Sequence, residues 1–257
     1  MPKNRLQKNE LCATIEKKNA KSRGEKTMIK REEQKDPKKR ILSVCVKMFI
    51  EKGFNETTML DIIREADVAA GTFQNIFRTK NGVLSALTEF MFKNQFGMAR
   101  EMSENVENPA FVYAAETAIQ LAITELNENI REIYIEVYTQ PKLYEYVYEN
   151  TSTEISKFFE KYNPGWSESD FYESALGTGG MMRAFMTRKC DKYFTLKRKI
   201  ERFLTMAFDV YHVSDDDKKD AIARIAAMDI VEASNAVLKK LYAALEMTFD
   251  FKFSREV

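Results

Sequence analysis

Two short helical segments separated by a tight turn, behind one amphipathic helix, constrain the fold of this chain more than any other feature. The first helix starts at Asp36 and Pro37, because an aspartate caps the first turn and proline is tolerated at the first helical position. Apolar residues then recur at helical spacing, namely Ile41, Val44, Cys45, Met48 and Phe49. Gly53 stands where a left-handed C-terminal cap is expected. The pattern predicts a helix that ends just before Gly53.

The two short segments follow directly. Thr58, with Asp61 three residues later, is typical of a capping box and predicts a helix over 59–66. Asp67 and the next residue interrupt the pattern, and a second short helix is expected over 70–77 with Phe73 and Phe77 facing inward. Two short helices joined in this way behind an amphipathic helix predict a helix-turn-helix.

The remainder of the chain also reads as helical. Only 9 glycines and 5 prolines occur in 257 residues, which favours an all-α fold. Further helices are expected at about 82–102, 110–127, 129–139, 142–161, 168–189, 195–212 and 215–248, with a break allowed in the last span. The predicted organisation is a flexible basic arm (1–35), a helix-turn-helix domain (36–82) and a larger helical bundle (83–257).

Charge is distributed unevenly along the chain. Residues 1–40 carry a net charge of +8, whereas residues 101–257 carry −8. A basic head on an acidic body suits contact with a polyanion, and a solvated, disordered tail is the alternative reading of residues 1–35. Met28 lies inside this arm and is an alternative to Met1 as the start of translation.

Several classes of protein are disfavoured. His212 is the single histidine, which argues against histidine-rich metal sites and multi-histidine catalysis, so neither an enzyme, a metal site nor a cofactor is predicted. The three cysteines, Cys12, Cys45 and Cys190, are odd in number and far apart, which indicates a reducing cytoplasm. No apolar stretch is long enough to span a membrane, and no secretory signal is recognisable.

The ordered set of caps and apolar positions resembles the DNA-binding domain of the TetR (tetracycline-repressor) family. The matching segments are 40–49, 53–54, 57–62, 66–73 and 77–80, about a fifth of the chain. The resemblance implies a bacterial transcriptional regulator, usually a repressor, with an N-terminal DNA-reading domain. It also implies a larger C-terminal domain that binds a small effector and forms a homodimer.

The resemblance further implies roles for residues that match the family pattern. Thr57, Thr58 and Lys80 align with positions that hold DNA phosphates, and a helix N-terminus suits an anion physically. Thr72 can reach a phosphate or a base edge. Gly71 allows close approach of the backbone to DNA.

Three positions depart from that pattern, and they are Asp67, Gln74 and Ile76, the last standing where the family usually has a histidine or an aromatic residue. Asp67 replaces the usual glycine of the turn, and aspartate tolerates a left-handed backbone better than most residues. Gln74 replaces the usual tyrosine and can form two hydrogen bonds with adenine, while Asn75 is expected to supply a phosphate contact. Ala70 offers only apolar contact, for example with a thymine methyl group. The alternative is that Gln74 and Asn75 are solvated helix surface.

The body carries no motif of its own. Its aromatic and methionine residues suit either an ordinary core or a ligand cavity. The candidate effector-binding residues are Gln120, Thr124, Tyr138, Arg183 and Phe185. A subunit interface is expected near 168–189 and 195–212, with Gly177, Gly180 and Phe203 as its candidate residues.

These observations predict a repressor that a small molecule releases from a near-palindromic operator. A two-fold dimer would present two recognition helices to successive major grooves, and the helix at 82–102 is expected to act as the lever between the domains. The alternative is a DNA-binding or partner-binding helical module that responds to a protein rather than to a small molecule.

Overall fold

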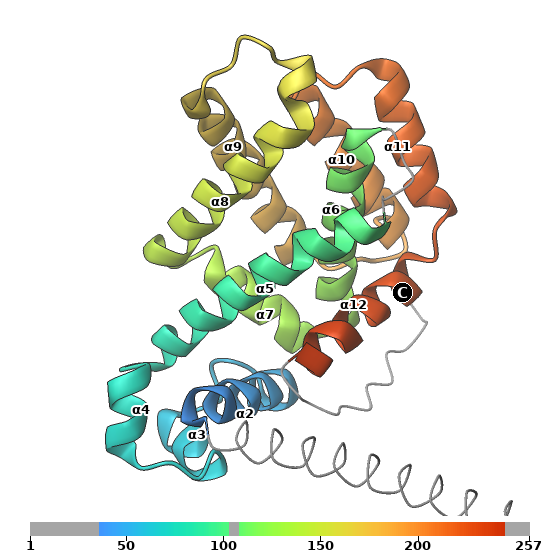
Figure 1. Cartoon of the computed structure of the whole chain (residues 1–257). Helices are drawn as coiled ribbons and strands as arrows, with labels where there is room; N and C mark the ends of the chain where they lie inside the picture. The colour runs from blue at the N-terminus through green and yellow to red at the C-terminus, as the bar shows by residue number, and fades with distance from the viewer. Residues whose placement is uncertain (1–35, 103–107, 245–257) are drawn as a thin grey trace, which may run out of the picture.

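A computed structural model describes residues 36–102 and 108–244, and every regular element within these ranges is helical (Figure 1). The expected basic arm, with Met28, lies outside the described residues. None of the described helices is both long and apolar enough to cross a membrane. The all-α fold class predicted from the sequence is confirmed.

The N-terminal unit consists of α2 (Pro37–Lys52), α3 (Met59–Glu65) and α4 (Ala70–Ile76). The predicted caps are present: the Asp36 side chain accepts a hydrogen bond from the Lys38 N–H at 2.9 Å, and Thr58 and Asp61 form a reciprocal capping box. Gly53 ends α2 with a φ of 98°, a conformation that glycine adopts without strain. Local sequence signals therefore set the boundaries of these helices.

A small apolar core holds the three helices together. Ile41, Cys45 and Phe49 of α2 are fully buried against Ile62 of α3 and Phe73 of α4. Each such side chain contributes about 1.5–3 kcal/mol when it leaves water. Burial raises the pKa of the Cys45 thiol, which is therefore a packing residue.

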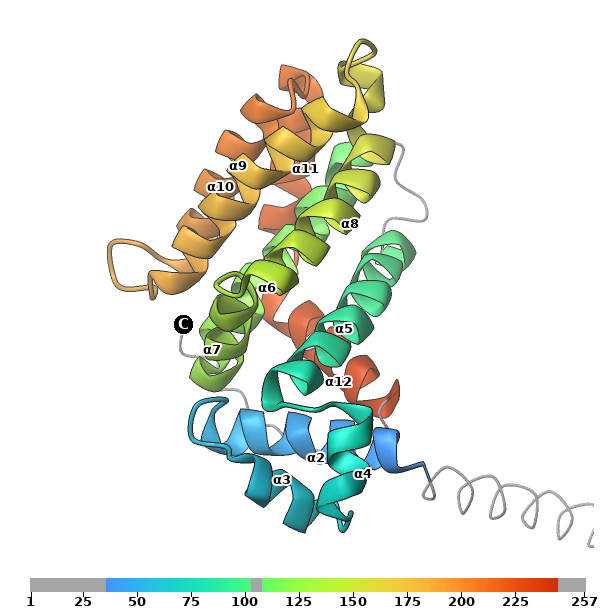
Figure 2. The same cartoon turned by 90° about the vertical axis from the view of Figure 1, so that its left-hand side faces the viewer.

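The body is a bundle arranged around one central helix. Its elements are α5 (Lys80–Met102), α6 (Pro109–Leu126), α7 (Glu128–Val137), α8 (Pro141–Phe159), the short 3₁₀ helix η1 (Glu160–Tyr162), α9 (Glu168–Thr187), α10 (Leu196–Val210), α11 (Asp215–Ala227) and α12 (Ile230–Ala244). The span expected as one helix over 215–248 breaks between α11 and α12. Figure 2 shows α6 among the other body helices.

Small side chains let the bundle close around α6. Ala110, Ala114, Ala118 and Ala122 recur every four residues along α6 and are fully buried, so neighbouring helices approach this face closely. Gly179 plays the same part between α9 and α8, because a Cβ at this position would clash with the ring of Tyr148. The packing explains why a glycine occurs inside α9 despite its poor helix propensity.

The last helix returns to the N-terminal unit. Figures 1 and 2 both show α12 close to α2, and Leu241 and Tyr242 of α12 line an apolar cleft together with Val46 and Ile50 of α2. The expected domain boundary between residues 82 and 83 falls inside α5, which is continuous across it. The N-terminal unit therefore contacts the body mainly through α2, which meets α5, α7 and α12.

Candidate nucleic-acid interface and cavities

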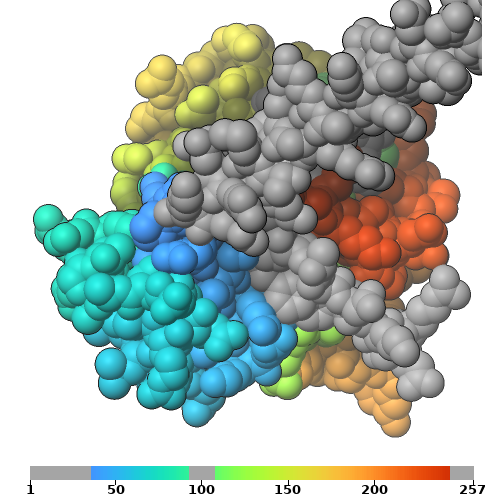
Figure 3. Space-filling view, turned by 60° about the horizontal axis from the view of Figure 1, so that its bottom comes forward, coloured from blue at the N-terminus to red at the C-terminus, as the bar shows by residue number. Residues whose placement is uncertain are grey.

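The outer face of α4 carries the residues expected to read DNA. Ala70, Gly71, Gln74 and Asn75 are exposed and Thr72 is half-buried, whereas Phe73 and Phe77 point into the core. Figure 3 shows the atoms of α2, α3 and α4 gathered at one side of the molecule. The exposed edge of the helix therefore presents two side-chain amides, those of Gln74 and Asn75, of the kind that can hydrogen-bond base edges in a major groove.

The turn before α4 is built as its sequence indicates. Asp67 adopts a left-handed backbone with a φ of 48°, which aspartate tolerates better than a bulky residue. The guanidinium of Arg40 donates a hydrogen bond to the Asp67 carbonyl at 3.3 Å. This contact ties the turn to the first part of α2.

The two threonines expected at phosphates occupy different environments. Thr57 is fully buried, and its hydroxyl donates to the Gly53 carbonyl at 2.7 Å, so the structure corrects the expectation that this hydroxyl faces DNA. Thr58 is exposed at the N-terminus of α3, where its hydroxyl exchanges hydrogen bonds with Asp61. Only Thr58 remains at the surface where a phosphate could approach.

Lys80 also has protein partners. Its ammonium donates to the carbonyl oxygens of Phe54 at 2.8 Å and Thr57 at 3.0 Å, and it lies 4.2 Å from the centre of the Phe54 ring. The lysine thus ties the start of α5 to the loop between α2 and α3. In this structure the side chain expected to hold a phosphate supports the helix-turn-helix from within.

A second polar connection joins the body to the N-terminal unit through α7. The Asn129 amide donates to the Ile50 carbonyl at 2.8 Å, at the end of α2. Glu132 accepts from the Phe54 backbone N–H at 2.9 Å and from the Asn55 side chain. Because these contacts engage backbone groups at the end of α2, a displacement of α7 would act directly on the helix-turn-helix.

Two adjoining cavities lie in the body. The first, with about 530 Å³ of unfilled volume, part of it open to solvent, is lined by α5, α6, α7 and α8 and includes Thr88 and Met91. The second has about 410 Å³ of unfilled volume, which also includes open solvent, and about 40 Å³ of it is open to the centre of a water-sized sphere; it is lined by α6, α8, α9 and α10 and includes Glu116. Two of the candidate effector-binding residues, Gln120 and Tyr138, line both cavities.

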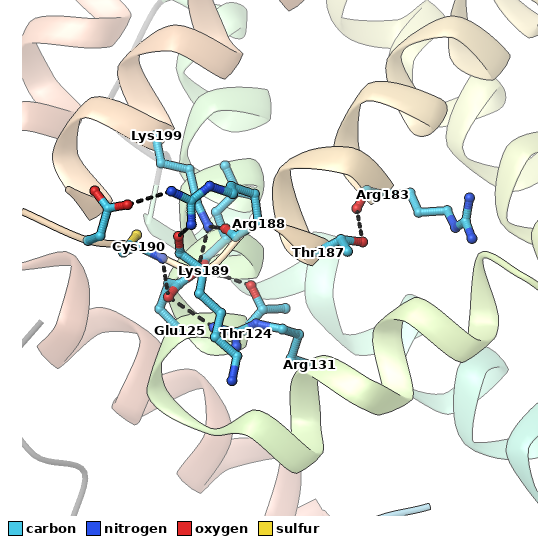
Figure 4. Close-up of polar contacts among 11 residues, drawn as sticks. Thr124, Glu125, Arg131, Arg183, Thr187, Arg188, Lys189, Cys190 and Lys199 are labelled. Atoms are coloured by element: carbon cyan, nitrogen blue, oxygen red, sulfur yellow. Dashed lines mark hydrogen bonds and ion pairs between the residues drawn. The ribbon is translucent and has the colours of Figure 1, made fainter. Parts of the chain in front are cut away.

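The other candidate effector residues lie elsewhere. The Thr124 hydroxyl donates to the Leu121 carbonyl at 2.9 Å and lines neither cavity. Arg183 is exposed, and Figure 4 shows its guanidinium pointing away from the neighbouring polar cluster. Phe185 packs on the rings of Phe194 and Phe203 instead of facing a cavity. The structure therefore separates these three residues from Gln120 and Tyr138.

A buried ionic cluster closes the end of the bundle near residue 190 (Figure 4). Glu125 pairs with Arg131 at 2.9 Å and with Lys199, and it also accepts a hydrogen bond from the Cys190 backbone N–H. Lys199 is fully buried and donates in addition to the Arg188 carbonyl. The cluster joins α6, α7 and α10 to the loop between α9 and α10, which is a structural role.

Three large apolar side chains are partly exposed on the outer surface of α9 and α10. Gly177 and Gly180 are exposed on α9, as expected for an interface, and Leu176 nearby is 37% exposed. On α10, Met206 is 49% and Val210 39% exposed. Phe203, expected at the interface, is fully buried and lines the second cavity instead, because it lies on the inner face of the amphipathic α10.

Two functional candidates were absent from the sequence-based prediction. Glu116 and Glu132 are single acidic residues in helices, and only the packing of α6 and α7 places one in a cavity and the other at the domain junction. Glu116 alone had a usable signal, because it interrupts an otherwise apolar stretch of α6. In the sequence, Glu132 cannot be distinguished from an ordinary surface glutamate, because its role depends on the packing of α7 against α2.

Comparisons with known proteins agree with this geometry. Residues 41–87 match the model of the bacterial regulatory proteins of the tetR family. An uncharacterised HTH-type transcriptional regulator, YuxN of Bacillus subtilis (strain 168), is 26% identical over 98 residues, which are 38% of this chain and 32% of that relative. The chain thus matches about a third of the length of YuxN.

A solved structure was also compared. The crystal structure of a gamma-butyrolactone receptor (ArpA-like protein) aligns with 79% of this chain and 98% of its own, with a TM-score of 0.43 and 11% identity. The matched family segment, 41–87, contains α3, α4, the turn between them, most of α2 and the start of α5. Through this N-terminal segment, the chain is similar to the bacterial regulatory proteins of the tetR family.

Proposed function

We propose that this regulator is a homodimeric repressor that a small molecule releases from a near-palindromic operator. The observation that carries the proposal is a cavity walled by α5 and α7, two of the helices that hold the helix-turn-helix on the body. A ligand in that cavity contacts both supports of α4 at once. Because the ligand would bind away from the surface that contacts bases, its control of DNA binding would be allosteric.

Residues on α4 supply the base contacts in this proposal. Gln74 reads adenine, Thr72 and Ala70 contact neighbouring base edges, and Asn75 and Thr58 contact phosphates. Gly71 has open space around it, so the DNA backbone can approach closely there. Exposed Arg78, directly after α4, adds a positive charge beside this edge.

In this proposal, dimerisation through the outer face of α9 and α10 brings together two copies of α4 for DNA binding. Leu176, Met206 and Val210 are exposed large apolar side chains on two helices that pack side by side. Such a patch is typical of a protein–protein interface. A two-fold axis there would place two copies of α4 on successive major grooves, with half-sites about 10 base pairs apart.

Effector control follows from a shift between two states of the dimer. A ligand acts only if it binds the released state more tightly than the DNA-bound state. The cavities between α5, α7 and α9 favour a small-molecule signal over a purely protein signal. A larger groove is lined by α10, α11 and the start of α12, and none of its lining residues lies on α5 or α7, so a ligand there would lack direct contact with these two helices.

The proposal is tested by selecting duplexes from a random library with the purified full chain. We expect an enriched near-palindromic motif that binds a dimer, measured by fluorescence anisotropy and sedimentation. A reporter with this motif over its promoter should then lose expression when the protein is produced. Enrichment of no motif, binding by a monomer, or increased reporter expression would each contradict part of the proposal.

A further inference from the structure

Glu116 is an acidic side chain buried in the wall of the second cavity. It is 4% exposed and lies on α6. Its carboxylate accepts one hydrogen bond, from the Gln120 side chain. Among the residues that the structure describes, no lysine, arginine or histidine forms an ion pair with it, and none lines either cavity. A carboxyl group in this position lacks the counter-ion that a buried charge requires.

The residues that line the second cavity with Glu116 are uncharged, and several of them are aromatic. Tyr113 comes from α6, Tyr138 from the end of α7 and Tyr148 from α8, while α9 and α10 contribute Thr178 and Phe203. The nearby cation Arg183 is exposed and acts on Tyr148 rather than on Glu116. Burial raises the pKa of Glu116 to about 8, so the group holds its proton at neutral pH.

We propose that this cavity binds an organic cation with an apolar body, such as an aromatic or alkyl ammonium, and that Glu116 is its counter-ion. The inference rests on the proposed function and names the class of its effector. A bound cation would supply the missing partner of the carboxylate, and the surrounding rings attract cations through their faces. An anionic ligand would meet an acid and no positive side chain from the described residues.

The proposal predicts that binding of the cation releases protons, which can be measured. Glu116 binds the cation as a carboxylate, so it releases its proton when the cation enters. At pH 7 nearly one proton per subunit should therefore appear in the buffer. Affinity for the cation should rise as the pH increases from 7 toward 8 and level off above it, because less of the protein then needs to lose a proton.

The experiment compares two ligands of the same shape on the full-length protein. Phenyltrimethylammonium is the cation and tert-butylbenzene its neutral isostere, and binding is followed by calorimetry at pH 7 in two buffers of different protonation enthalpy. For the wild type we expect tighter binding of the cation with release of about one proton. In Glu116→Gln the cation should bind about 30-fold more weakly without proton release, while tert-butylbenzene is unaffected.

Glu149→Gln, an exposed change of the same kind on α8, is the control and should bind both ligands as the wild type does. Equal binding of the cation by wild type and Glu116→Gln, equal binding of the two ligands by the wild type, or no binding of the cation would overturn the inference. Operator binding is measured separately on the same samples. Cation binding that needs Glu116 but leaves the operator complex intact would contradict the proposed function and not the counter-ion.

Discussion

Glu132 of α7 accepts a hydrogen bond from the backbone N–H of Phe54 at 2.9 Å, so a helix that lines the cavity directly holds the loop between α2 and α3. The same carboxylate binds the Asn55 side chain. The sequence pointed to the helix at 82–102 as the lever between domains. The structure adds α7 as a second connection, through its contacts with the end of α2 and the loop that follows it.

Glu132→Ala is expected to weaken this connection. Loss of the two hydrogen bonds should lower the free energy of unfolding by about 1.5–3 kcal/mol, because the acceptor is charged. Ligand should then change operator affinity less than in the wild type, as measured by anisotropy with and without effector. Glu136→Ala, one turn further along α7 and bonded to Gln140, is the control. An unchanged ligand effect in Glu132→Ala would exclude α7 from the coupling.

Gln74→Ala is expected to relax selectivity at one base pair of the operator. The amide can hydrogen-bond adenine twice, which is worth about 1–3 kcal/mol of discrimination. Binding to an operator library with each position randomised measures the effect. Gln140→Ala in the body makes the same chemical change away from α4. If the library shows the same preference at every position, Gln74 is solvated surface.

Lys80→Met is expected to act on stability rather than on phosphate binding. The ammonium holds two backbone carbonyls, so its removal should reduce the stability of the helix-turn-helix, measured by thermal unfolding. The slope of log affinity against log salt should stay as in the wild type. Arg78→Asn, at an exposed position with a φ of 61°, should lower that slope by about one. A lower slope for Lys80→Met would restore its phosphate role.

Glu125→Gln is expected to be strongly destabilising at pH 7. Burial alone would raise the pKa of Glu125, but hydrogen bonds from Lys199 and Cys190, with the charges of Lys199 and Arg131, outweigh it and lower the pKa. The variant leaves two cations without a full partner, which costs about 3–5 kcal/mol. The charged carboxylate stabilises the fold at pH values above the pKa that Glu125 has in the unfolded chain. This stabilisation is lost as the pH falls through the lower pKa that Glu125 has in the folded protein.

The difference in unfolding free energy between wild type and Glu125→Gln should therefore shrink below about pH 4.5. Chemical denaturation at a series of pH values measures it. Glu128→Gln is the control, because Glu128 pairs with Lys189 at the exposed surface, where an ion pair contributes little. A difference that stays constant down to pH 3 would mean that the cluster does not depend on the charge of Glu125.

Met206→Glu is expected to break the proposed dimer. A carboxylate in an apolar two-fold contact meets its own copy and loses water without a partner. Sedimentation should show monomers, and operator affinity should fall because each half-site is bound independently. Ala223→Glu, at an exposed position of α11, adds the same charge elsewhere. A stable Met206→Glu dimer would place the interface on another face.

Local order was predictable because the signals lie within a few residues of one another. The capping box of Thr58 and Asp61, the end of α2 at Gly53 and the left-handed turn at Asp67 all depend on short-range backbone chemistry. The exposed edge of α4 followed from helical periodicity alone. Phe203 marks the limit of prediction from sequence. The sequence predicted a helix around this residue, but it did not show that the Phe203 side chain lies on the buried face of that helix.

The sequence by itself determined the all-helical class, the helix boundaries in the N-terminal unit and the resemblance to the family, since caps, turns and apolar spacing act over one or two helical turns. Only the tertiary structure decided that Thr57 is buried, that Lys80 serves the loop before α3, and that Glu116 reaches a cavity. These outcomes depend on how helices distant in the chain pack against each other, and a side chain's neighbours, solvent and charge state follow from that packing.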